Sequence, residues 1–292
     1  CTRHMNDSLN SLVGIHAYVF PYIKKLGDLT GKTILDIPSG DGRATNIFKE
    51  QGAKVISLDI FPRTEKSYTS QYGDMGEKLD IDDNVIDIII CQEGIEHISD
   101  QYFLLKEFNR ILRKGGELII TTPNISNVRS KISNLFTESD MWKRMPYTEL
   151  DSIWHIENKS MKFYFGHLFL LPVNHLKTLL VLNGFGNFIY KRTKISTSSM
   201  LLGLLLYPVY LILNIIAYLT NIRKNKHINL SIKKRILWDR LLLNLSFTTL
   251  FYKHIFWVCK KNHSLGEVIK TIDEMQNEMP EEMVLEREIV KK

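Results

Sequence analysis

The chain has 292 residues and a net charge of +6, with 44% hydrophobic and 24% charged residues. This composition excludes a disordered chain, and the length fits one large domain with an elaboration, or two small domains. Its three cysteines are too few and too scattered for a disulfide framework or a cysteine metal site, and they favour buried thiols in a reducing compartment.

The positive charge is concentrated in one short segment. Residues 222–240 contain seven basic residues and one acidic residue, which equals the net charge of +6. The rest of the chain is therefore balanced, whereas a nucleic-acid-binding protein would be expected to spread basic residues over a face of its core. Nucleic acid is thus disfavoured as a partner. The basic residues of this segment are Arg223, Lys224, Lys226, Lys233, Lys234, Arg235 and Arg240.

The first half of the chain predicts an α/β fold. Residues 1–4 resemble an expression scar before Met5, and residues 6–26 predict a helix that is broken or kinked at Pro21. From residue 32 onward, short β-branched runs alternate with helical patterns, which is typical of a doubly wound parallel sheet. The expected strands are 32–37, 54–59, 85–91 and 117–122, and the expected helices are 43–51 and 101–113.

The second half is less regular. Residues 125–166 have no clear period and predict a loop-rich cover over one end of the sheet, followed by a helix over 172–183. Two strand-like segments, 185–192 and 253–261, are expected to pair as the last hairpin of the sheet. The predicted units are therefore 1–29 (scar and helical cover), 30–193 (core), 194–252 (insertion), 253–262 (last core strand) and 263–292 (helical acidic tail).

The insertion contains the most apolar segment of the chain. Residues 195–222 are 28 uncharged residues, which is long enough to span a bilayer, since about 20 residues suffice. A simple span would need a second crossing to return to the sheet, and the next uncharged run, 241–252, has only 12 residues. Pro208 also favours a bent or re-entrant element. We therefore expect an in-plane or hairpin-like insertion whose basic flank faces anionic headgroups, with burial in the protein or in the dimer interface of a homo-oligomer as the alternative.

A glycine turn follows the first predicted strand, in L-D-I-P-S-G-D-G-R at residues 35–43. Gly40 and Gly42 let the backbone approach a ligand closely, and the helix start presents free N–H groups. Asp59 ends the second strand, 17 residues beyond Gly42, where a carboxylate can accept both hydroxyls of a ribose. Together these residues predict a nucleoside-containing cofactor. A dinucleotide-binding turn would prefer a third glycine where this chain has Thr45.

This pattern resembles the class I S-adenosylmethionine-dependent methyltransferases, whose turn reads L-D-x-G-x-G-x-G. The resemblance continues through G-D-M at 73–75, the strand at 85–91 and the segments 107–124 and 166–185. It covers roughly residues 30–190 and 253–261. It implies a Rossmann-like sheet of seven mostly parallel strands that ends in an antiparallel hairpin.

The resemblance also implies where S-adenosylmethionine would bind. Gly40 and Gly42 would lie under its methionine portion, Asp59 would hold the ribose, and Asp74 would hold the adenine amino group. Pro38 stands where the family has its first glycine, so the local contacts of the turn should differ from the family pattern. The remaining expected pocket residues are Asp36, Met75 and Gln92.

Acidic and imidazole side chains cluster at the end of the strand at 85–91, in E-G-I-E-H at 93–97. If a helix begins there, Glu93, Glu96 and His97 lie on one face and converge. Methyl transfer to an alcohol needs an aligned acceptor and a base or metal that takes its proton. The spacing E-x-x-E-H resembles the metal site of ubiquinone-pathway O-methyltransferases and of small-RNA 2′-O-methyltransferases.

That resemblance implies that Glu93, Glu96 and His97 bind Mg²⁺ or another divalent cation, with His155 or His167 as a further ligand. Metal-free general-base catalysis by His97 or Glu93 is one alternative, and a structural role for the histidine is the other. Metal-assisted catalysis and metal-free general-base catalysis both predict O-methylation.

Three classes of function follow from these features. In the first, the chain is a cytoplasmic enzyme on the inner face of the cell membrane that methylates a lipid-linked glycan or a surface polysaccharide precursor. The insertion and T-P-N at 122–124 resemble methyltransferases of that kind, and a quinone-type lipid acceptor is a close variant. The second class is a metal-dependent RNA 2′-O-methyltransferase, and the third is a non-catalytic membrane scaffold.

Overall fold

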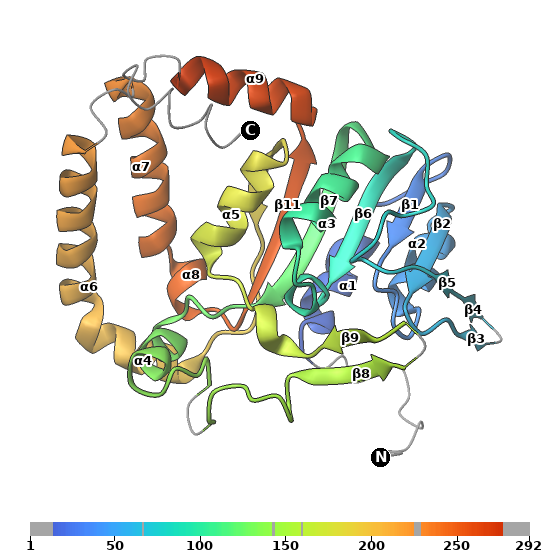
Figure 1. The fold of residues 1–292 in the computed structure, drawn as a ribbon, viewed down its shortest axis with the longest axis horizontal. Helices are drawn as coiled ribbons and strands as arrows, with labels where there is room; N and C mark the ends of the chain where they lie inside the picture. Colours follow the sequence, from blue (N-terminus) through green and yellow to red (C-terminus); the bar gives the residue numbers. More distant parts are fainter. Residues whose placement is uncertain (1–13, 66, 142–143, 159, 225–228, 277–292) are drawn as a thin grey trace.

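The computed structural model describes residues 14–65, 67–141, 144–158, 160–224 and 229–276. A seven-stranded sheet, in the order β10-β11-β7-β6-β1-β2-β5, forms its centre (Figure 1). β11 is antiparallel to both of its neighbours, and the other pairings in this sheet are parallel. The predicted doubly wound, seven-stranded fold is thus confirmed. The strands are β1 (Thr33–Asp36), β2 (Lys54–Asp59), β5 (Gln71–Tyr72), β6 (Ile86–Gln92), β7 (Leu112–Pro123), β10 (Phe185–Tyr190) and β11 (His254–Lys261).

Helices cover both faces of the sheet, which explains the continuous apolar runs of its central strands. On one face, α1 (His16–Lys24) and α2 (Arg43–Glu50) pack against Ile88 and Ile90 of β6. On the other face, α3 (Gln101–Ile111) and α5 (Val173–Leu182) pack against Ile89 and Cys91 of the same strand. Alternate residues of β6 therefore belong to two separate hydrophobic cores.

Most of the elements expected in the core are present. The observed α1 lies within the predicted helix 6–26 and includes Pro21, whereas the predicted scar and the residues before 14 lie outside the described part. The predicted helix 172–183 is α5, and the two late strand-like segments pair as β10 and β11. The prediction of a final antiparallel hairpin is therefore confirmed.

The prediction of a loop-rich segment at 125–166 is wrong in detail. This segment contains α4 (Val128–Thr137) and a hairpin of β8 (Ile153–Glu157) and β9 (Lys162–Phe165). The Asn127 side chain caps α4, because its oxygen accepts the Ser130 N–H at 2.9 Å. The hairpin runs across the lower edge of the sheet in Figure 1, so the segment does cover that edge.

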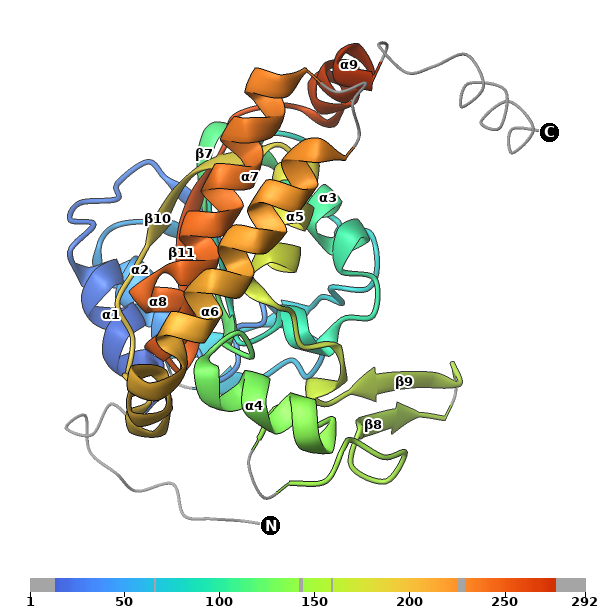
Figure 2. The ribbon, with the colours of Figure 1, turned by 90° about the vertical axis from the view of Figure 1, so that its left-hand side faces the viewer.

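The insertion forms a helical hairpin. It consists of α6 (Thr197–Arg223), α7 (Leu230–Leu245) and the short α8 (Phe247–Phe251). Both views show α6 and α7 side by side, and Figure 2 places this pair in front of α5 and the sheet. α6 continues through Pro208, and its first turns lie at an angle to the rest of the helix in Figure 1. α6 is also long and apolar enough to cross a membrane by length and composition.

The tail begins with α9 (Leu265–Gln276), which packs Val268 against the rest of the chain and exposes Ile269. Residues 277–292 lie outside the described part, so the acidic end of the predicted tail is not described. A two-stranded ribbon of β3 (Thr64–Glu65) and β4 (Tyr68–Thr69) lies between β2 and β5 in the chain.

Candidate functional site

A cavity of about 490 Å³ lies at the carboxyl ends of β1, β2 and β6. Parallel strands end at the same edge of a sheet, and this edge is the usual ligand site of open α/β folds. The volume lies within the range of small-molecule sites, about 300–1,000 Å³. Residues expected to bind a cofactor line it, namely Asp36, Pro38, Gly40, Asp59, Asp74, Met75 and Gln92. Glu93 and His97 also line it, whereas Gly42 and Glu96 do not.

The two glycines of the turn have different environments. Gly40 lines the cavity, has φ +53°, and donates its N–H to Asp59 Oδ2 at 2.9 Å. Gly42 has φ +73°, and a Cβ built there would lie 2.2 Å from Cγ of Tyr68. The ring of Tyr68 is held by a hydrogen bond between its hydroxyl and Ser39. Gly42 is therefore required for packing under Tyr68, and its place under the cofactor stays a prediction.

Asp36 and Thr45 explain the missing third glycine. Thr45 Oγ1 donates to Asp36 Oδ2 at 2.6 Å and lies 2.8 Å from Ser57 Oγ, so a buried hydrogen-bond network joins α2 to β1 and β2. Burial raises the pKa of Asp36 to about 7 although Thr45 partly opposes the shift. A glycine at position 45 would remove this network.

The two acids assigned to the nucleoside lie on the cavity wall. Asp59 accepts the N–H groups of Gly40 and Phe61, both at 2.9 Å. Asp74 accepts the Gly76 N–H at 2.7 Å, and its other oxygen lies 2.7 Å from Nζ of Lys162. Lys162 comes from β9 and also pairs with Glu77 at 2.5 Å, so the hairpin is attached to the adenine end of the predicted site.

Pro38 makes a contact that the family's glycine could not make. A Cβ added at Gly94 would lie 2.5 Å from Cδ of Pro38 and 3.2 Å from Cε of Met75. Gly94 thus allows the loop after β6 to pack closely against the glycine turn. This contact brings Glu93 to the same cavity as the turn.

The expectation that Glu93, Glu96 and His97 lie on one helix is wrong. Only η1 (Ile95–His97) is helical, as one turn of 3-10 helix, and Glu93 precedes it with φ +48°. The Glu93 N–H donates to Thr121 O at 3.1 Å, so Glu93 continues the pairing of β6 with β7 beyond the end of β6. Gly94 then redirects the chain, and Glu93 does not share a helix face with Glu96.

Both glutamates are nevertheless close enough to interact. Burial raises the pKa of Glu93 and of Glu96, and the charge of Glu93 raises the pKa of Glu96 further. Glu96 is fully buried, and its Oε2 accepts the Thr122 hydroxyl at 2.9 Å. Oε2 of Glu93 lies 3.7 Å from Nε2 of His254.

Three oxygen atoms at the end of β6 lack hydrogen-bond partners within the described residues. They are the Oε1 atoms of Gln92, Glu93 and Glu96, and all three are buried. The amide nitrogen of Gln92 lies 2.6 Å from Nδ1 of His16, which fixes the orientation of this side chain. Buried acceptors of this kind normally have a partner, so these oxygens are suited to a hydroxyl group or a cation.

His97 has one nitrogen committed to the backbone. Its Nδ1 lies 2.9 Å from Phe165 O and 3.1 Å from Gly166 O. Because a carbonyl oxygen only accepts, the neutral imidazole carries its proton on Nδ1, and the lone pair on Nε2 is left for another partner. The ring also lies beside Trp154, with ring centroids 6.0 Å apart.

The structure distinguishes the two histidines proposed as further ligands. His167, in η2 (His167–Phe169), has its ring centroid 5.0 Å from that of His97, and its ligand atom lies within 4.8 Å of those of Glu96 and His97. His155 instead stacks on Tyr164 of β9. Among the described residues, Glu96, His97 and His167 therefore form a group that could hold a metal, and Glu93 does not belong to this group.

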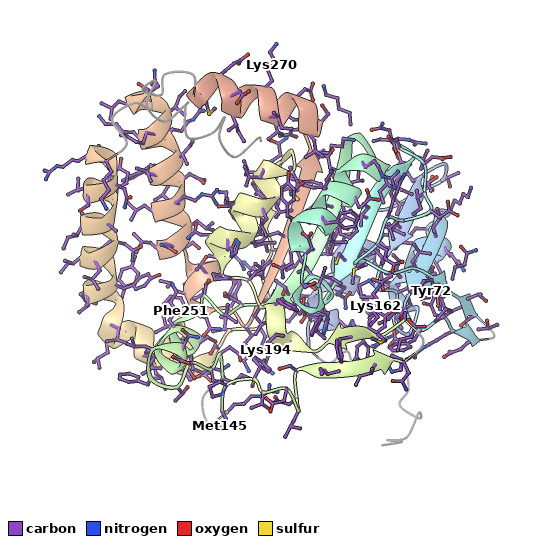
Figure 3. All side chains as sticks on the ribbon, viewed as in Figure 1. Tyr72, Met145, Lys162, Lys194, Phe251 and Lys270 are labelled. Carbon is purple, nitrogen blue, oxygen red and sulfur yellow. The ribbon has the colours of Figure 1, made fainter. Side chains whose placement is uncertain are left out.

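Several residues of the site were not predicted from the sequence. Trp154, Tyr164 and Phe165 of the β8–β9 hairpin line the cavity, as does His16 of α1. The hydroxyl of Tyr164 in the hairpin lies 3.5 Å from that of Tyr72 in β5, and Figure 3 labels Tyr72 and the hairpin residue Lys162 in this part of the molecule. Only the density of aromatic residues in 142–169 could have indicated this role, because no spacing in the sequence relates the hairpin to β5.

Comparison with known proteins identifies related sequences. A family model described as "Methyltransferase domain" matches residues 14–187. A ubiquinone biosynthesis O-methyltransferase of Xylella fastidiosa is 29% identical over 114 residues, which are 35% of this chain and 46% of that protein. A probable S-adenosylmethionine-dependent methyltransferase of Mycolicibacterium smegmatis is 29% identical over 101 residues, 32% of this chain and 39% of that protein. The chain thus spans less than half the length of the curated relatives it matches.

A solved structure also resembles this fold. A SAM-dependent methyltransferase from Archaeoglobus fulgidus aligns with a TM-score of 0.46 and 16% identity, over 83% of this chain and 93% of that one.

Proposed function

Because this chain belongs to the S-adenosylmethionine-dependent methyltransferases, we propose that it methylates a hydroxyl of a lipid-linked glycan or surface polysaccharide precursor at a membrane surface. The proposed location is the cytoplasmic side of the cell membrane. The observation that supports O-methylation most directly is the pair of buried, unpartnered oxygens on Gln92 and Glu93, which line the same cavity as the expected cofactor residues.

The residues of the cavity fit S-adenosylmethionine. Gly40 leaves open space beside its Cα, since an added Cβ would meet nothing within 4 Å. Asp59 and Asp74 place carboxylates on the wall, and Met75 and Ile60 provide apolar surface. When bound, S-adenosylmethionine supplies a methyl group on a positively charged sulfur. In the proposed arrangement Gly40 borders its methionine portion, Asp59 holds the ribose, and Asp74 holds the adenine.

The chemistry asks the protein to align the acceptor and to remove its proton. A transfer would break the bond between sulfur and methyl carbon as the bond between acceptor oxygen and that carbon forms, and the hydroxyl proton would have to leave. Nε2 of His97 has a free lone pair and Glu93 has an unpartnered oxygen, so either can take this proton. The raised pKa of Glu93 makes its carboxylate a stronger base than an exposed glutamate.

A divalent cation also fits the group of Glu96, His97 and His167, of which His97 lines the cavity. The unpartnered Oε1 of the fully buried Glu96 is the observation that favours a ligand there. A bound cation would lower the pKa of the acceptor hydroxyl. Two imidazoles and one carboxylate suit Mn²⁺, Fe²⁺ or Zn²⁺ better than Mg²⁺, which prefers oxygen ligands.

Exposed apolar residues near the site support a lipid-linked acceptor. Leu135 and Phe136 of α4 are each 75% exposed, and Met145 and Leu150 in the following loop are 78% and 89% exposed. α4 lies between the α6–α7 hairpin and the β8–β9 hairpin in Figure 1, and Lys131 of α4 bonds to Tyr210 of α6. A lipid tail could therefore reach from the insertion toward the cavity over apolar surface.

A quinone-type lipid is the second candidate acceptor. The similarity to ubiquinone biosynthesis O-methyltransferases favours it, and a phenolic hydroxyl would meet the same base. RNA 2′-O-methylation is a third candidate, for which the only specific observation is the proximity of His167 to Glu96 and His97.

The test is methyl transfer from labelled S-adenosylmethionine to three separate acceptors: an extracted lipid-linked glycan fraction, a catechol quinone analogue, and small RNA. We expect base-stable label in the glycan fraction, because an ether survives alkali whereas an ester does not. Label found only in the catechol, or only in the RNA, would identify that molecule as the acceptor in place of the glycan. If calorimetry detects no binding of S-adenosylmethionine, the proposed methyltransferase activity is refuted.

A further inference from the structure

In the middle of α6, apolar side chains face outward and the amide side chain faces the rest of the protein. Within residues 201–219 the exposed positions of α6 are apolar apart from the hydroxyl of Tyr207, and the one amide, Asn214, faces inward. Asn214 Oδ1 accepts the Asn244 amide of α7 at 2.9 Å, and Asn244 Oδ1 accepts the Asn174 amide of α5 at 2.8 Å. The polar contacts therefore lie inside the hairpin, and the apolar side chains point away from the protein.

The exposed side of α6 is extensive. Its large apolar side chains that are at least 49% exposed are Leu201, Leu204, Leu205, Val209, Ile212, Leu213, Ile216 and Leu219. At 100° per residue these positions cover about half of the helix circumference. Protein interfaces normally include about one hydrogen bond per 100–200 Å², which such a surface cannot provide, whereas the hydrocarbon region of a lipid layer requires none.

Basic residues lie at both ends of this apolar surface. Arg192 and Lys194 precede α6, Arg223 and Lys224 end it, and all four are exposed. A helix that spans a membrane would place its two ends on opposite sides, whereas a helix that lies in the surface places both ends among headgroups. The charge distribution thus fits an in-plane helix on an anionic surface.

The packing of α7 excludes a spanning orientation of α6 in this structure. α7 runs beside α6 and carries Lys234, Arg235 and Asp239, all exposed. Each charge placed at the bilayer centre costs about 2.5–3.5 kcal/mol. Lys177 of α5 also bonds to Asp239 at 2.7 Å, so a spanning α6 would draw the enzyme core into the bilayer.

We infer that the outer face of α6 inserts into the surface of an anionic membrane with its axis parallel to the bilayer, while α7 and α5 remain on the aqueous side. This inference specifies the membrane contact on which the proposed function rests. α6 is the membrane-binding element, and the inner polar contacts attach it rigidly to the catalytic core.

The test uses the full chain and vesicles of phosphatidylcholine with about 30% phosphatidylglycerol, compared with phosphatidylcholine alone. We expect flotation with the anionic vesicles and at least about tenfold weaker partition with the neutral ones. Leu205→Glu with Leu213→Glu should reduce binding by at least about tenfold, because two charges then face the lipid. The matched control, Val181→Glu with Ile269→Glu, alters exposed apolar residues of α5 and α9 and should float like the wild type.

Depth measurements test the orientation. Ile212 and Leu219 lie within about 20° of one another around the part of α6 that follows Pro208, so a fluorophore on a cysteine at each should be quenched equally by shallow lipid labels. A spanning helix would instead place position 212 deeper than position 219. Failure to float, or a dimer in solution that Leu205→Glu with Leu213→Glu dissociates, would overturn the inference. S-adenosylmethionine binding measured in the same samples separates this failure from failure of the proposed enzyme.

Discussion

Replacing Gly42 by alanine should cost more folding stability than replacing Gly40, although both belong to one turn. Both residues have positive φ, so alanine costs about 1–2 kcal/mol at either position. At Gly42 the added Cβ would also lie 2.2 Å from the Tyr68 ring, whereas at Gly40 it meets nothing within 4 Å. Displacing a packed side chain costs a further 1–3 kcal/mol or so, which gives about 2–5 kcal/mol for Gly42→Ala.

Cofactor affinity should respond in the opposite order. Gly40 lines the cavity and Gly42 does not, so a methyl group at position 40 would take up space in the proposed S-adenosylmethionine site. We expect Gly40→Ala to weaken binding at least about tenfold, equivalent to about 1.4 kcal/mol, and Gly42→Ala to change the affinity of the folded protein much less.

Urea unfolding gives the free energies, and calorimetry gives the affinities. Tyr68→Ala provides the control background, because removal of the ring should reduce the cost of Gly42→Ala to about that of Gly40→Ala. The reasoning is refuted if Gly42→Ala costs no more than Gly40→Ala, or if its extra cost persists without Tyr68.

Three further predictions concern the acidic and imidazole groups. His167→Ala should abolish Mn²⁺ binding measured by calorimetry, and His155→Ala should retain it, since only His167 lies near Glu96 and His97; equal effects would contradict the proposed ligand set. Asp36 has a pKa raised from 3.8 to about 7, so its contribution to folding stability is present below about pH 4 and lost as pH rises through 7. Asp36→Asn should therefore gain up to about 4 kcal/mol relative to wild type between pH 4 and pH 8 in urea unfolding, and a pH-independent difference would argue against a buried neutral carboxyl. Glu93→Gln should slow methyl transfer by about 10²–10⁴-fold if Glu93 is the base, and it should remove the rise in rate that accompanies ionisation of this raised-pKa group; an unchanged pH–rate profile would assign the proton to another residue.

The order of elements in the core could be predicted because it depends on local patterns. Continuous β-branched runs such as that of β6 are buried on both faces only in a parallel sheet covered by helices, and the glycine turn and Asp59 mark where such a sheet binds nucleosides. The places of Asp36, Gly40 and Asp59 on the cavity wall follow directly, because parallel strands end at one edge.

The β8–β9 hairpin and the acidic cluster could not be placed in the same way. Lys162 reaches Asp74, and Phe165 O reaches His97, across sequence separations of 88 and 68 residues that no periodicity relates. Glu93 was misplaced because its left-handed backbone and the close contact of Gly94 with Pro38 prevent the helix that its spacing suggests.

By itself, the sequence determined the sheet, the cofactor turn and the existence of an apolar insertion, because burial period and glycine geometry are local properties of the chain. Only the tertiary structure decided which side chains meet. Three features depend on contacts between elements that are distant in the chain, and such contacts arise only when the cores form. They are the packing of Tyr68 on Gly42, the closeness of His167 to Glu96 and His97, and the inward orientation of Asn214.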